Sequence, residues 1–141
     1  MQSPILLAFI DKPNATGEQL WQASILCLRL GYIPQSMTFA FEAVKKEPDW
    51  QARYNSYYLY ALKLAAEFYE EIGNYTNTMF YWEQVTKQTP QNMEAWHGLA
   101  VAKANLGDFG GAELALGQAL RIEPQNQKLR KLLSEVQAHR T

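Results

Sequence analysis

The chain has 141 residues, of which 48% are hydrophobic and 19% charged, so it can bury the core of one domain or of one short repeat array and is not a disordered chain. Its 13 basic and 14 acidic residues give a net charge of -1, and no concentrated basic face is present, which argues against nucleic-acid binding. Cys27 is the single cysteine, so no internal disulfide forms. The sequence also lacks a secretory signal and the roughly 18 consecutive apolar residues of a membrane-spanning helix, and we expect a soluble cytoplasmic protein without membrane insertion.

Residues 1–16 are predicted to form a short apolar helix at the N-terminus. Ser3 suits the position before a helix and Pro4 its first turn, and residues 5–10 are all apolar. We expect this helix to cap the helices that follow. Two other placements remain open, in a groove of the same chain or between two subunits.

Three segments then repeat one pattern of small residues, a turn glycine and a closing proline. In segment 17–50 the pattern is carried by Leu20, Ala23, Ser24, Cys27, Gly31, Ser36, Ala40, Ala43 and Pro48. In segment 59–92 it is carried by Leu62, Ala65, Ala66, Tyr69, Gly73, Trp82, Val85 and Pro90. In segment 93–126 it is carried by Trp96, Leu99, Ala100, Gly107, Ala112, Leu116, Ala119 and Pro124.

This pattern resembles the tetratricopeptide repeat family, and the interval from Pro90 to Pro124 is one repeat of that family. The resemblance implies an all-α fold, a right-handed superhelix (α-solenoid) of antiparallel helix pairs. Three repeats cover 17–126, divided into 17–50, 51–92 and 93–126. The glycines of the pattern predict the turn inside each pair, because the residue after a helix end often needs a positive φ, and Asn74 and Asp108 are predicted to cap the helices that follow two of these turns.

The second repeat is predicted to begin with an elongated helix. The interval from Pro48 to Pro90 is longer than that from Pro90 to Pro124, and no glycine or proline occurs from 49 to 72. The additional length corresponds to about two helical turns. The added turns carry an aromatic stripe that either packs over the second helix of the first repeat or is exposed as an interface. The stripe consists of Trp50, Tyr54, Tyr57 and Tyr58.

Residues 127–141 are predicted to form a C-terminal capping helix, since Leu129, Leu132, Leu133 and Val136 follow a helical spacing. A repeat array needs such a helix to cover its last apolar surface.

Catalytic and metal-binding residues are not predicted. His97 and His139 are far apart in the sequence, and with Cys27 they are the only thiol or imidazole side chains. No phosphate-binding loop or nucleophile motif occurs, so we expect a protein that is not an enzyme and binds no cofactor.

In the tetratricopeptide family the first helices of the repeats line a concave groove that binds protein segments. Partner-binding candidates at the groove positions of this chain are Trp21, Ile25, Leu28, Tyr60, Lys63, Glu67, Glu70, Glu71 and His97. They indicate a protein or peptide partner with apolar anchors and basic residues. The best-known family groove binds acidic chaperone tails through Lys, Asn and Arg residues, and this basic clamp is absent here. The matching positions hold Trp21, Ile25, Leu64, Glu94 and Gly98.

The leading interpretation is therefore a non-enzymatic scaffold or assembly adaptor that binds a partner segment in its concave groove. The alternative is a self-associating module, a homodimer formed through the Tyr-rich helix or the N-terminal helix. The order of an N-terminal helix followed by three repeats is also similar to that of bacterial secretion chaperones.

Overall fold

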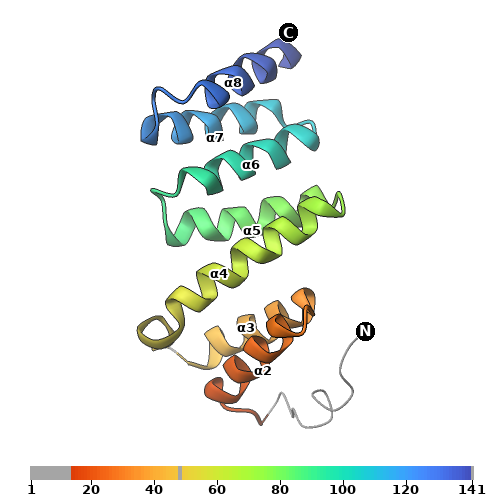
Figure 1. The fold of residues 1–141 in the computed structure, drawn as a ribbon, viewed down its shortest axis with the longest axis vertical. Helices are drawn as coiled ribbons and strands as arrows, with labels where there is room; N and C mark the ends of the chain where they lie inside the picture. Colours follow the sequence, from red (N-terminus) through yellow and green to blue (C-terminus); the bar gives the residue numbers. More distant parts are fainter. Residues whose placement is uncertain (1–13, 48, 141) are drawn as a thin grey trace. The chain divides into compact units, whose positions relative to one another are not determined.

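The structure is a computed structural model that describes residues 14–47 and 49–140. Within these ranges every regular element is an α-helix. The helices are α2 Gly17–Arg29, α3 Ile33–Lys46, α4 Trp50–Glu71, α5 Tyr75–Gln88, α6 Met93–Asn105, α7 Phe109–Ile122 and α8 Gln127–Arg140 (Figure 1). Most of the expected N-terminal helix, residues 1–13, lies outside the described residues, as does Pro48.

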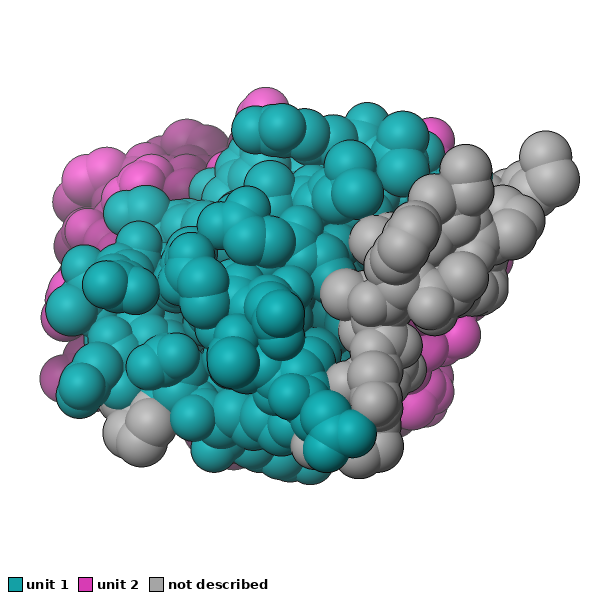
Figure 2. All heavy atoms as spheres, turned by 90° about the horizontal axis from the view of Figure 1, so that it is seen from below, with its two compact units in different colours: residues 1–65 teal, residues 66–141 magenta. Residues whose placement is uncertain are grey.

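The chain divides into two compact units, unit 1 with residues 1–65 and unit 2 with residues 66–141 (Figure 2, teal and magenta). The division falls inside α4, whose 22 residues exceed the 13 or 14 of every other described helix. The first part of α4 therefore belongs to unit 1 and its last turns belong to unit 2.

Unit 1 is built on the antiparallel pair of α2 and α3, which pack along their lengths. Both helices bury small side chains, among them Ala23 and Ala40, and the buried Ser24 of α2 hydrogen-bonds to Ser36 of α3. Larger side chains such as Phe39 are almost fully buried. Burying one such side chain contributes about 1.5–3 kcal/mol to folding.

Unit 2 contains α5, α6, α7 and α8, and each of these helices packs against the next (Figure 1). Trp82 of α5 is buried under Gly98 of α6, where an added Cβ would lie 2.6 Å from Cε2 of the indole. On α8, Leu129 and Val136 are buried while most of the remaining helix is exposed. The helix packs against α7, and these are its two buried side chains.

The turns within the helix pairs contain the predicted glycines in the predicted conformation. Gly31, Gly73 and Gly107 have φ angles of 83°, 77° and 84°, a region that other residues rarely adopt. The two predicted caps are also confirmed. The side chain of Asn74 accepts a hydrogen bond from the Asn77 amide (3.1 Å), and that of Asp108 accepts one from the Gly111 amide (2.9 Å).

Candidate functional site

The aromatic stripe at the start of α4 packs inside unit 1 instead of forming an exposed interface. Its rings surround Trp21 of α2, which is 0% exposed. The ring centroid of Trp21 lies 4.8 Å from that of Tyr54, in a stacked arrangement, and 6.1 Å from that of Trp50. The rings of Tyr57 and Tyr58 meet the same indole edge to face at 5.8 and 5.9 Å.

Two sequence predictions are corrected by this cluster. The sequence predicts Trp21 on a partner-binding surface, but its side chain is closed off by the rings of α4. Trp50 and Tyr58 are predicted at an alternative interface and are instead buried, at 8% and 5% exposure. The stripe also lies mainly on α2 and not on the second helix of the repeat, although Tyr58 meets Phe41 of α3 edge to face at 6.5 Å. Most of the surface proposed for self-association through the Tyr-rich helix is therefore packed inside unit 1.

A buried hydrogen-bond network fixes the same helices to one another. The Tyr57 hydroxyl lies 2.7 Å from the Ser24 hydroxyl and 3.2 Å from the Ser36 hydroxyl. Each serine also donates to the backbone carbonyl of the other at 2.8 Å. Burial raises the pKa of the Tyr57 hydroxyl. Side chains from α2, α3 and α4 thus hydrogen-bond to one another, with both serines buried and Tyr57 half-buried.

The remaining candidates of unit 1 are partly or fully accessible. Ile25 and Leu28 of α2 are half-buried, and so is Lys63 of α4. Tyr60 is 58% exposed, so the exposed part of its aromatic ring is available to a partner. In unit 1, Ile25, Leu28 and Tyr60 therefore offer accessible apolar surface, whereas the indole of Trp21 does not.

In unit 2 the acidic candidates are all exposed. Glu67, Glu70 and Glu71 lie at positions i, i+3 and i+4 of α4, a spacing that places them on one side of the helix. None of the three forms an ion pair with the residues that the structure describes. His97 on α6 is half-buried. The negative charge on the last turns of α4 is therefore available to basic groups of a partner.

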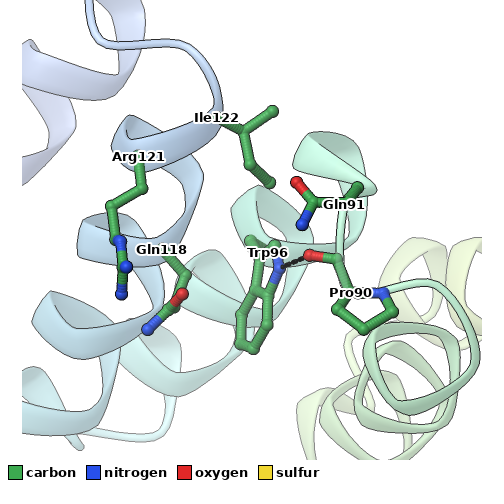
Figure 3. Close-up of a pocket in the computed structure, with 6 residues that line it drawn as sticks. All are labelled: Pro90, Gln91, Trp96, Gln118, Arg121 and Ile122. Carbon is green, nitrogen blue, oxygen red and sulfur yellow. Dashed lines mark hydrogen bonds between the residues drawn. The ribbon is translucent and has the colours of Figure 1, made fainter.

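A pocket in unit 2 was not predicted from the sequence. It has a volume of about 310 Å³ and lies between the end of α7, the start of α6 and the loop before α6 (Figure 3). Its lining residues are Pro90, Gln91, Trp96, Gln118, Arg121 and Ile122. Because they come from three separate segments, no local pattern marks them, and only the turn proline and the repeat position of Trp96 gave a partial signal.

Residues 14–47 and 49–140 contain no cluster of three His, Cys, Asp or Glu side chains placed to hold a metal ion. Over the same residues no helix combines the length and the apolar composition needed to cross a membrane. Cys27 is buried in unit 1, and burial raises the pKa of its thiol.

Three solved structures share the helix arrangement. A tetratricopeptide domain from a putative FK506-binding protein of Plasmodium falciparum has a TM-score of 0.65 and 18% identity, over 89% of this chain and 93% of that one. The first tetratricopeptide domain of Spaghetti (RPAP3), bound to the HSP90 peptide SRMEEVD, has a TM-score of 0.58 and 13% identity, over 89% and 94%. The Sgt2 tetratricopeptide domain from Aspergillus fumigatus has a TM-score of 0.54 and 17% identity, over 86% and 77%.

The chain has the tetratricopeptide repeat fold. The fold class predicted from the sequence, an all-α array of antiparallel helix pairs, is therefore confirmed. The three neighbours are tetratricopeptide domains. No family model matches the sequence, and neither does any curated protein sequence.

Proposed function

We propose that this chain is a non-enzymatic scaffold that binds a segment of a partner protein through exposed side chains on the first helices of its repeats. The observation that carries the proposal is the row of exposed carboxylates on α4, since three acidic groups on one side of a helix are left without an ion pair among the described residues. The likeness to the Spaghetti domain, which has a peptide bound, supports a peptide as the kind of ligand.

The accessible candidates differ in chemistry between the two units. In unit 1, Ile25, Leu28 and Tyr60 provide apolar contacts. In unit 2, Glu67, Glu70 and Glu71 provide negative charge. A partner with apolar anchors and several Lys or Arg residues satisfies both. Three exposed ion pairs would together raise the affinity roughly threefold to 100-fold, since each contributes little alone.

An acidic tail like that in the Spaghetti complex is not the expected partner. The last four residues of SRMEEVD are two glutamates, a valine and an aspartate, so three of the four are acidic. In this chain Glu94 stands where the resemblance places a clamp lysine, and like charges oppose binding. We therefore expect the surface formed by the partner-binding candidates to have no measurable affinity for this peptide.

Display selection from a random peptide library on the full chain tests the proposal. We expect the selected peptides to be enriched in Lys, Arg and large apolar residues. Glu70→Lys is expected to weaken their binding, while Glu135→Lys, the same charge reversal at an exposed residue of α8, leaves it unchanged. Tyr60→Ala is likewise expected to weaken binding. Its control is Leu114→Ala, which removes a side chain that is 76% exposed on α7 and should leave binding unchanged.

The proposal is wrong if the selected peptides carry no positive charge, or if Glu70→Lys binds them as tightly as the native chain does. It is also wrong if Glu135→Lys weakens binding to the same degree, because the effect would then come from net charge alone.

A further inference from the structure

The pocket at the start of the third repeat is separate from the surface proposed above. None of its six lining residues is one of the partner-binding candidates. Its volume of about 310 Å³ lies at the lower end of the range of ligand pockets. It therefore has room for one or two side chains of a peptide, and all of its walls belong to unit 2.

The walls are held in place by backbone and packing interactions. The indole N–H of Trp96 donates a hydrogen bond to the backbone carbonyl of Pro90 at 2.8 Å, which fixes the ring against the loop (dashed in Figure 3). Gln118, Arg121 and Ile122 lie at positions i, i+3 and i+4 of α7, so their side chains leave the same side of the helix. The pocket is thus preformed by two helices and a fixed turn.

The charged and carboxamide side chains that line the pocket have no hydrogen-bond or ion-pair partner among the described residues. Arg121 and the carboxamides of Gln91 and Gln118 form no hydrogen bond or ion pair with other described residues. Arg121 is also the only charged residue of the six that line the pocket. The acidic residue nearest to it in sequence, Glu123, accepts a hydrogen bond from Asn126 at 3.0 Å and does not line the pocket. The pocket therefore carries one positive charge that the protein does not neutralise there.

We propose that this pocket is a second binding site, for a carboxylate of a partner peptide with an apolar neighbour. The planar guanidinium of Arg121 can pair with both oxygens of a carboxylate, a geometry that lysine does not offer. The carboxamides supply additional N–H donors. Trp96 and Ile122 offer apolar surface to the residue beside the carboxylate. This site is positively charged and the surface on α4 is negatively charged, so the two sites select different parts of a partner.

The test uses the full ¹⁵N-labelled chain and three short peptides. The probes are acetyl-Leu-Asp-Leu-amide, its neutral counterpart acetyl-Leu-Asn-Leu-amide, and acetyl-Leu-Leu with a free terminal carboxylate. The indole N–H signal of Trp96 is assigned by its loss in Trp96→Phe. We expect the aspartate peptide to shift this signal and the amide signals of Gln91 and Arg121. The asparagine peptide is expected to bind about threefold to tenfold more weakly, as for a charged hydrogen bond at a partly exposed site.

The two carboxylate peptides distinguish the source of the group. Binding of the aspartate peptide assigns the site to an acidic side chain, and binding of acetyl-Leu-Leu alone assigns it to a chain terminus. Both results support a carboxylate site. The proposal would be overturned if the asparagine peptide bound as tightly as the tighter-binding of the two carboxylate peptides, or if every probe left the Trp96 indole signal unchanged.

Arg121→Gln provides the second arm. The side chain is exposed and makes no hydrogen bond in the described part of the chain, so we expect this variant to fold like the native protein. It should bind the aspartate peptide only as weakly as the asparagine peptide. Lys131→Gln on α8 removes the same charge outside the pocket and should not change the affinity. Native affinity in Arg121→Gln contradicts the proposal, and this outcome is independent of any result at Glu70.

Discussion

The close contact between α5 and α6 predicts opposite effects for the same substitution at two glycines of unit 2. Gly98 lies over the buried indole of Trp82, and a Cβ added there would be 2.6 Å from Cε2 and 2.9 Å from Cδ1. Gly117 lies inside α7 on an exposed part of the helix, and a Cβ added there meets no atom within 4 Å. Both glycines are in helix interiors, so alanine improves the helix propensity equally.

The magnitudes follow from two opposing terms. Replacing glycine by alanine in a helix interior stabilises by about 1 kcal/mol, which is the full expected effect of Gly117→Ala. Overpacking of a well-packed core costs about 1–3 kcal/mol, so Gly98→Ala is expected to lower the free energy of unfolding by up to about 2 kcal/mol. The helix term cancels in the comparison, and the two variants should differ by about 1–3 kcal/mol.

Urea unfolding followed by circular dichroism measures both variants against the native chain. The reasoning is refuted if Gly98→Ala stabilises the protein as much as Gly117→Ala does. In a Trp82→Phe background the smaller ring leaves room for the added methyl group, and the difference between the two variants should shrink, which identifies the indole as the cause.

Two further predictions concern unit 1. Tyr57→Phe removes the hydroxyl that hydrogen-bonds to Ser24 and Ser36. We expect urea unfolding to show that the free energy of unfolding falls by about 0.5–1.5 kcal/mol. An unchanged free energy of unfolding would mean that the two serines satisfy each other's hydrogen bonds without Tyr57. For Glu18, the hydrogen bond from Tyr54 is the main cause that holds the pKa of the carboxyl below its usual value. Because the pKa of Glu18 is lower in the folded than in the unfolded state, its ionisation stabilises the fold when the pH is above the unfolded-state pKa. This contribution is lost as the pH falls through the folded-state pKa. Unfolding experiments from pH 6 down to pH 2 should therefore show a steeper loss of stability for the native chain than for Glu18→Gln, and parallel curves would contradict the assigned shift.

The features that the sequence predicted well are those set by local chemistry. Gly73 and Gly107 mark turns because the conformation there is unfavourable for other residues, and Asn74 and Asp108 cap helices because their side chains reach a backbone amide three residues ahead. When such signals recur at a fixed interval, they specify the order of helices without any tertiary information.

The position of Trp21 could not be predicted in the same way. The repeat pattern places it on a groove, but the additional turns of α4 bring four aromatic rings over it, and that contact depends on tertiary packing. An aromatic stripe has the same spacing whether it is buried or exposed, so periodicity alone did not separate the two. The carboxylate pocket was missed for a related reason, since its walls join only after α6 and α7 have packed.

The hydrogen bond from Trp96 to the carbonyl of Pro90 has a counterpart one repeat further along the chain. There the Nε of Arg130 donates to the carbonyl of Pro124 at 2.9 Å, compared with 2.8 Å for the indole. The indole of Trp96 and the guanidinium of Arg130 thus make the same contact in successive repeats. Each connects the start of a helix to the proline turn before it. The two residues share an N–H group that reaches the carbonyl of a proline six residues earlier. We therefore expect Trp96→Arg to keep this hydrogen bond, whereas Trp96→Phe, the closer match in shape, loses it because phenylalanine has no N–H group.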